Sequence, residues 1–63
     1  MADVIVRQAS LDDVEDIYRI EKLCFPDPWS RDALNYELGE NPRAFYIVAE
    51  LGGDVVGYAG LWW

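Results

Sequence analysis

The chain has 63 residues, enough for one domain, and a domain of this size buries only about 60% of its unfolded surface, so its stability is marginal. Twelve acidic and five basic residues give a net charge of −7. This charge excludes sequence-independent binding to nucleic acid, which needs Lys and Arg to displace counterions. The acids suit a basic protein or peptide partner, or they serve only to keep an apolar chain soluble.

The single cysteine and the lengths of the apolar runs indicate the compartment. Cys24 has no second cysteine with which to form an internal disulfide, so we expect a reducing environment, with Cys24 as a small core residue. No apolar run approaches membrane-spanning length, and none follows a basic leader. We therefore expect a cytoplasmic protein with no membrane partner.

The first expected elements are a strand and a helix. Residues 4–6 are all β-branched and predict a short buried strand. Ser10 and Asp13 have the spacing of a capping box, which begins a helix. An apolar stripe at three- and four-residue spacing then predicts that helix: Leu11, Val14, Ile17, Tyr18, Cys24 and Phe25. Capping and solubility explain the acids around its first turn: Asp12, Asp13, Glu15 and Asp16.

Two prolines end this helix. Proline disfavours helical geometry in the preceding residue, so Pro26 and Pro28 push Phe25 and Asp27 toward extended conformations. Ser30 then caps a second helix that begins near residue 31. Its stop signals are Gly39, Asn41 and Pro42.

The last third of the chain predicts a hairpin. Residues 43–51 are apolar on both alternating faces, which is typical of a central strand. Gly52 and Gly53 follow, and tight hairpin turns need positive φ. In the returning strand, residues 54–63, Gly57 and Gly60 indicate a bulge or a close backbone approach. Left as a sheet edge this apolar strand would promote aggregation, so we expect it to be continued, covered or paired.

The order strand, helix, helix, strand, strand predicts an α+β fold in one unit over residues 1–63. Patterns for catalysis are scarce. The chain has no histidine, and Cys24 has no evident base beside it, so triads and Cys/His metal sites are not supported. No glycine-rich loop opens a helix for a phosphate group. We therefore assign no catalytic, cofactor-binding or metal-binding residue.

Asp27 is the sharpest candidate for a binding role. It lies between two prolines, so its carboxylate is presented with little freedom, which lowers the cost of binding a cation such as a protonated amine. Phe25 and Trp29 flank it and could wall a small apolar pocket. In the alternative, which residue chemistry by itself favours, Asp27 fixes a turn and the two aromatic residues join the helices.

Glu21 lies one turn before Phe25, on or beside the apolar stripe. A partly buried acid there needs a partner, such as Lys22 or a backbone donor. It could assist a proton relay, although a position at the rim is the more ordinary expectation. Tyr46 and Tyr58 are expected to face each other across the hairpin, where cross-strand packing explains them.

Several segments resemble the GNAT superfamily of acetyl-CoA-dependent N-acetyltransferases: Ile20-Glu21, residues 25–30 (Phe-Pro-Asp-Pro-Trp-Ser), residues 46–49 (Tyr-Ile-Val-Ala) and residues 55–58 (Val-Val-Gly-Tyr). More narrowly, they resemble the ribosomal-protein-alanine N-acetyltransferases. The resemblance implies a mixed sheet, of which this chain would be the N-terminal part. It also makes the loop between the two helices a wall of the peptide-acceptor groove, with four acceptor contacts: Phe25, Pro26, Asp27 and Trp29.

In that family a deprotonated amine attacks the thioester of acetyl-CoA directly, with a general base and an acid to move the protons. The family's cofactor loop, the helix after it and the acid and base have no counterpart in this sequence. The resemblance therefore implies an acceptor-side segment that is inactive alone and holds no acetyl-CoA, the co-substrate of the full-length family. Its partner would be a peptide or protein N-terminus.

A second hypothesis is a non-catalytic interaction module. In this reading the terminal strand pairs with another copy or another protein by β-augmentation, and the acidic surface selects basic partners. Self-association through that strand is expected under either hypothesis.

Overall fold

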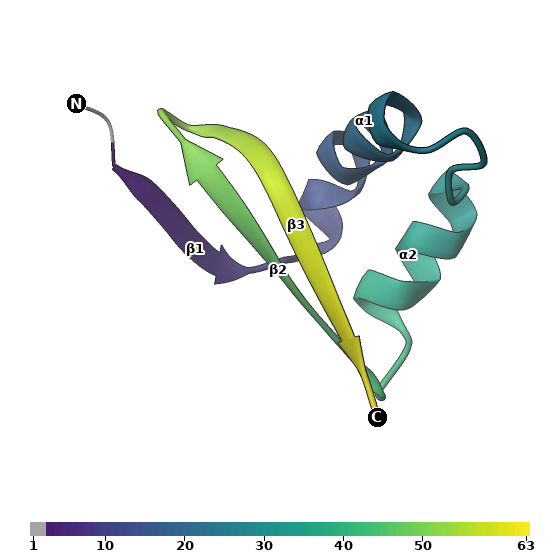
Figure 1. The fold of residues 1–63 in the computed structure, drawn as a ribbon. Helices are drawn as coiled ribbons and strands as arrows, with labels where there is room; N and C mark the ends of the chain where they lie inside the picture. Colours follow the sequence, from purple (N-terminus) through teal and green to yellow (C-terminus); the bar gives the residue numbers. More distant parts are fainter. Residues whose placement is uncertain (1–2) are drawn as a thin grey trace.

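The computed structural model describes residues 3–63, in which two helices lie between a first strand and a hairpin (Figure 1). In chain order the elements are β1 (Val4–Gln8), a 3-10 turn (Leu11–Asp13), α1 (Val14–Cys24), α2 (Arg31–Gly39), β2 (Ala44–Leu51) and β3 (Asp54–Trp62). This order confirms the α+β fold predicted from the sequence.

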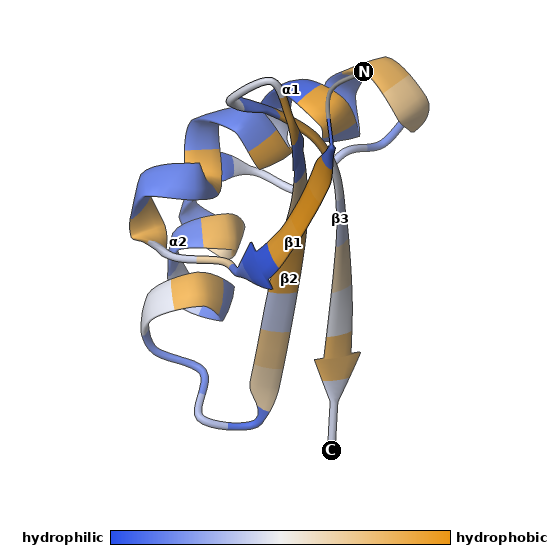
Figure 2. Ribbon diagram, turned by 90° about the vertical axis from the view of Figure 1, so that its left-hand side faces the viewer, coloured by the Kyte–Doolittle hydropathy of each residue, from blue (hydrophilic) through white to orange (hydrophobic). Residues whose placement is uncertain are grey.

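The sheet has the order β1-β2-β3, so β2 is the central strand, as its two apolar faces predicted. Both pairings are antiparallel, and the parallel pairing that a mixed sheet requires does not occur among these three strands. Both helices cover one face of the sheet, and within residues 3–63 the other face carries no helix (Figures 1 and 2).

The hairpin turn and the glycines of β3 have the geometry that the sequence indicated. Gly52 and Gly53 have φ angles of 60° and 88°, a region that glycine enters without steric cost. The β2–β3 register shifts between Ala49 and Glu50, which leaves Val56 as an extra residue in β3. The predicted bulge is therefore confirmed beside Gly57.

The start of the helical segment is fixed by a capping box and an ion pair. The Ser10 N–H donates to Asp13 Oδ2 at 2.8 Å, as the spacing predicted. Arg7 of β1 adds two hydrogen bonds to the Asp13 carboxylate, at 2.7 and 2.9 Å, and a third to Glu50 at 2.8 Å. The Asp13 side chain is buried, and these bonds satisfy its carboxylate and join the first strand to the helical segment.

We expect this ion pair to make stability depend on acid. The Arg7 hydrogen bonds, with the Ser10 N–H, hold the pKa of Asp13 below its ordinary value of 3.8. Since the folded-state pKa is the lower one, the stabilisation is present above about pH 4 and is lost as the pH falls through the folded pKa. In thermal unfolding followed by circular dichroism, the melting temperature should fall less on acidification in Asp13→Asn than in the unsubstituted chain. Asp12→Asn is the matched control, and equal falls in all three proteins would contradict the prediction.

The core lies between α1, α2 and the inner face of β2 and β3. Ile17 of α1 and Val48 of β2 are completely buried at its centre. The core residues are Val14, Ile17, Leu34, Val48 and Val55, with Ala9, Tyr18, Ile20, Leu38 and Tyr58 packed against them. The predicted apolar stripe is thus confirmed for its central residues.

The predicted burial was wrong for the first strand and for both ends of the apolar stripe. Residues 4–6 form the expected strand, but their side chains are between 56% and 61% exposed. Val4 and Val6 lie on the sheet face away from the helices, and Ile5 lies on an edge strand that the helices do not cover. Leu11 and Phe25 of the stripe are also exposed. Cys24 is exposed rather than a core residue, because its side chain lines two open hollows at the end of α1.

The face of the sheet opposite the helices carries no helix within residues 3–63 (Figure 2). Most of the side chains on it are apolar, so we call it the outer apolar face. Strand alternation and register place these residues on it: Val4, Val6, Phe45, Ile47, Ala49, Leu51, Ala59 and Leu61. Among residues 3–63, no helix has both the length and the apolarity needed to cross a bilayer.

Candidate functional site

The loop of residues 25–30 is held at both ends by the helices that it joins. Phe25 is extended (φ −129°, ψ 138°), and its N–H donates to the Glu21 carbonyl at 3.0 Å, so α1 ends where the prolines predicted. At the other end the Ser30 hydroxyl accepts the Ala33 N–H at 3.1 Å and begins α2, also as predicted. Asp27 lies midway between these two ends.

The centre of the site is the buried carboxylate of Glu21, which is 5% exposed. Its Oε1 accepts the backbone N–H of Trp29 at 3.0 Å, and its Oε2 accepts the hydroxyl of Tyr58. We call this arrangement the Glu21 bridge. The backbone donor was among the partners considered from the sequence, but the rim position was wrong, because the side chain turns toward the sheet. Lys22 instead lies over the ring of Tyr18.

An aromatic pocket of about 120 Å³ adjoins the bridge. The ring of Trp62 lies 6.0 Å from that of Trp29 and meets the ring of Tyr46 edge-on at 5.6 Å. Gly60 allows this packing, because a Cβ there would lie 2.5 Å from the Tyr46 ring. The pocket is lined by Glu21, Trp29, Leu34, Tyr46, Tyr58, Gly60 and Trp62.

Burial and negative charge make both tyrosines of this pocket harder to deprotonate than an ordinary tyrosine. Burial and the hydrogen bond to Glu21 raise the pKa of Tyr58 well above its ordinary value. Burial, with the charges of Glu37 and Glu21, raises the pKa of Tyr46 to about 12. Because its pKa is raised, Tyr58 can remain a hydrogen-bond donor to Glu21 at a pH at which an ordinary tyrosine has lost its proton.

The four predicted acceptor contacts lie on one loop but not in one pocket. Trp29 lines the aromatic pocket, whereas Phe25 lines a separate hollow beside Gly57 and Ala59. Pro26 and Asp27 are exposed and line neither of these two hollows. A single pocket walled by Phe25 and Trp29 around Asp27 is therefore not formed. The role of these four residues as acceptor contacts stays a prediction.

Sequence reasoning missed the link between Glu21 and β3. Tyr46 and Tyr58 do not face each other, because the register places Tyr46 opposite Gly60 and Tyr58 opposite Val48. They lie diagonally on the same face, and only Tyr58 reaches Glu21. The usable signal was the helical spacing, since Glu21 lies four residues after the buried Ile17.

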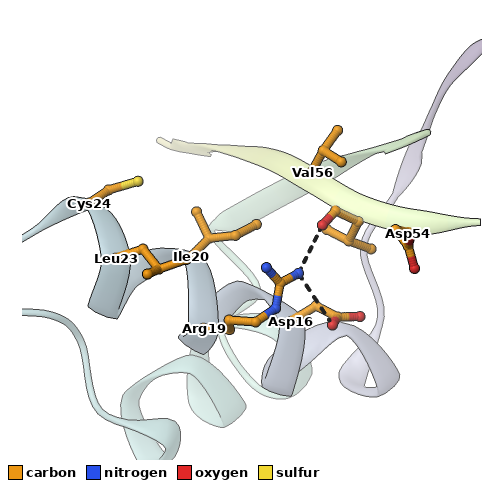
Figure 3. A pocket seen from close by; sticks show the side chains of 8 residues that line it. Asp16, Arg19, Ile20, Leu23, Cys24, Asp54 and Val56 are labelled. Atoms are coloured by element: carbon orange, nitrogen blue, oxygen red, sulfur yellow. Dashed lines mark hydrogen bonds and ion pairs between the residues drawn. The ribbon is translucent and has the colours of Figure 1, made fainter.

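A larger hollow of about 630 Å³ lies between α1 and the start of β3 (Figure 3). Its arginine is used within the fold: Arg19 Nη2 donates to the Val55 carbonyl at 3.0 Å and lies 3.6 Å from Asp16. The rest of the lining is mainly apolar, from Ile20, Leu23 and Val56. We therefore place the candidate site at the Glu21 bridge and loop 25–30. Within residues 3–63 no cluster of three potential metal ligands occurs.

Comparison with known proteins decides the family. The acetyltransferase (GNAT) family model matches residues 14–63, which is most of the chain. The chain belongs to the GNAT family. This GNAT chain is also 44% identical, over 57 residues, to a Bacillus subtilis (strain 168) protein named "Putative ribosomal protein bS18-alanine N-acetyltransferase". The matched segment is 90% of this chain and 38% of that relative, so the GNAT chain spans well under half of the relative's length. No solved structure matches this chain.

Proposed function

We propose that this chain is the acceptor-side part of an acetyl-CoA-dependent N-acetyltransferase that modifies the α-amino group of a protein. The match to the GNAT family over residues 14–63 carries the proposal. The name of the Bacillus relative supports an N-terminal alanine of a ribosomal protein as the acceptor. The net charge of −7 agrees with a basic protein substrate.

In this proposal, loop 25–30 binds the acceptor peptide. Asp27 is exposed on a segment that two prolines stiffen, so its carboxylate can meet a protonated amine at little entropic cost. Trp29 contributes to a small aromatic pocket that suits a short side chain. These residues bind and orient the acceptor, and none of them is proposed as the general base.

GNAT enzymes use acetyl-CoA as co-substrate, and residues 3–63 do not fit its pyrophosphate. A helix N-terminus after a glycine-rich loop is the usual anion cradle. Here, α1 begins with acidic residues, α2 begins with a Ser30 cap, and the Gly52-Gly53 pair opens a strand. We therefore propose that acetyl-CoA and the proton-transfer groups belong to a part of the enzyme outside this chain, and that the 63 residues alone do not catalyse transfer.

A chimera tests this function. This chain replaces the matched segment of the Bacillus relative, and transfer of labelled acetyl groups to a peptide with the bS18 N-terminal sequence is measured. We expect transfer by the chimera and by the intact relative, and none by the relative with the segment deleted. A chimera that folds and binds acetyl-CoA but leaves every peptide unmodified would refute the acceptor role.

The outer apolar face favours a second candidate, an interaction module. We expect the 63-residue chain to associate with itself, because within residues 3–63 the outer apolar face is uncovered and the β3 edge is unpaired, and both features promote pairing. Light scattering should show dimers or larger species, and the melting temperature should rise with concentration. Leu61→Lys on β3 should weaken association, and Leu23→Lys on α1, also exposed, should not. A monomer at high concentration would remove this candidate.

A further inference from the structure

We propose that Glu21 is a positioning residue, which holds loop 25–30 against β3 so that its acceptor contacts keep one arrangement. The proposal rests on the proposed function for the meaning of the loop. The structural claim, that Glu21 orders the loop, is testable without any acetyl transfer.

The two oxygens of Glu21 bind two segments that are distant in sequence. The donor to Oε1, the Trp29 N–H, is eight residues away, and the donor to Oε2, the Tyr58 hydroxyl, is 37 residues away. Both donors are neutral, and none of the ion pairs within residues 3–63 includes Glu21. Burying a carboxylate costs free energy unless hydrogen bonds satisfy it. These two bonds therefore offset the cost of burying Glu21.

Between its two ends, the loop is held by the hydrogen bond from the Trp29 N–H to Glu21. The loop is otherwise attached through the Phe25 N–H and the Ser30 cap, at its two ends. Trp29 is attached twice: its N–H binds Glu21, and its ring packs against Trp62 near the end of β3. Because Pro26 and Pro28 restrict the residues between, fixing Trp29 also limits where Asp27 can lie.

A positioning role differs from a proton-relay role in what it requires of the side chain. Glutamine can keep both contacts, since its oxygen accepts the Trp29 N–H and its amide group donates to the Tyr58 oxygen. Glutamine does not titrate, so it cannot relay a proton. If Glu21 positions the loop, Glu21→Gln should therefore keep the loop ordered and the acceptor activity intact. If Glu21 relays a proton, Glu21→Gln should lose the activity.

The first test is amide hydrogen exchange at Trp29 in the 63-residue chain. In Glu21→Ala, exchange at Trp29 should become about tenfold faster or more relative to the core amides of β2. Glu21→Gln should keep most of the protection, and Tyr58→Phe should lose part of it, because the carboxylate is then anchored to α1 alone. Asp12→Asn, an exposed acid before the same helix, is the control. If the Gln variant is folded and Trp29 exchanges as fast as in the Ala variant, the proposal is overturned.

The second test is acceptor kinetics in the chimera. The KM for the peptide should rise about tenfold or more in Glu21→Ala, since the peptide must then order the loop as it binds, while the KM for acetyl-CoA stays constant. Glu21→Gln should restore the peptide KM. Restored exchange protection with a lost kcat in the Gln variant would overturn the positioning role in favour of a proton relay. An inactive chimera whose variants show the expected exchange pattern would instead contradict the proposed function alone.

Discussion

Asp27→Ala in the chimera is expected to lower kcat/KM for the peptide acceptor by about tenfold to a hundredfold, because a hydrogen bond to a charged group contributes about 1.5–3 kcal/mol. The Kd for acetyl-CoA should be unchanged, since Asp27 is exposed on loop 25–30, which in our proposal contacts the acceptor peptide and not acetyl-CoA. Steady-state kinetics with varied peptide, and acetyl-CoA titration of the same preparations, measure the two quantities.

Two further variants separate charge from fold in this experiment. Asp27→Glu keeps the charge and should retain part of the acceptor activity. Asp32→Ala removes an exposed acid in the first turn of α2, close in sequence but outside the loop, and should leave kinetics unchanged. Acceptor kinetics that do not change in Asp27→Ala would remove this residue from the site, and equal losses for both substrates would indicate a general structural effect.

Ile17→Ala is expected to have the largest effect on stability. Ile17 is fully buried between the helices and the sheet, and such a truncation costs about 2–5 kcal/mol in lost transfer free energy and in the cavity that remains. At about 0.05–0.15 kcal/mol per residue, a chain of this length has a total stability of only about 3–9 kcal/mol. The substitution should therefore remove a large share of the total free energy of unfolding. Urea unfolding followed by far-ultraviolet circular dichroism measures the change.

Val6→Ala is the matched control for this prediction. Val6 is also a β-branched apolar residue, but it lies on an edge strand and is 61% exposed. At a protein concentration at which light scattering shows a monomer, its truncation should change the free energy of unfolding by about 0.5 kcal/mol or less. Similar losses in the two variants under that condition would contradict the prediction.

The elements were predictable because their signals are local. The Ser10–Asp13 spacing, the two prolines and the glycine pair each act on backbone within a few residues, and the structure confirms all of them. Burial was less predictable, because it depends on which elements cover which. The β-branched run in β1 specified a strand, but only the sheet order shows that the strand lies at an edge, with its side chains exposed.

Within the candidate site, too, the features with local signals were predictable and those that depend on packing were not. Loop 25–30 could be located from its prolines and aromatic residues, since they constrain their own neighbourhood. The partners of Glu21 could not, because Tyr58 comes from the far end of the chain and its orientation depends on the hairpin register. Asp13 is a similar case: its cap was visible in the sequence, but its ion pair with Arg7 required the packing of β1 beside the 3-10 turn.

The extra residue in β3 decides on which face of the sheet each later side chain of that strand lies. The turn pairs Leu51 with Asp54, and an unshifted register would continue to place Tyr58 opposite Ile47, on the outer apolar face. Val56 reverses this alternation, so the side chains of Tyr58 and Trp62 turn toward the helices. The pocket therefore depends on how many residues separate the turn from Gly57, as well as on which residues they are. Among relatives of this chain, a change in the length of that short segment would alter the character of the inner face more than almost any single substitution within it.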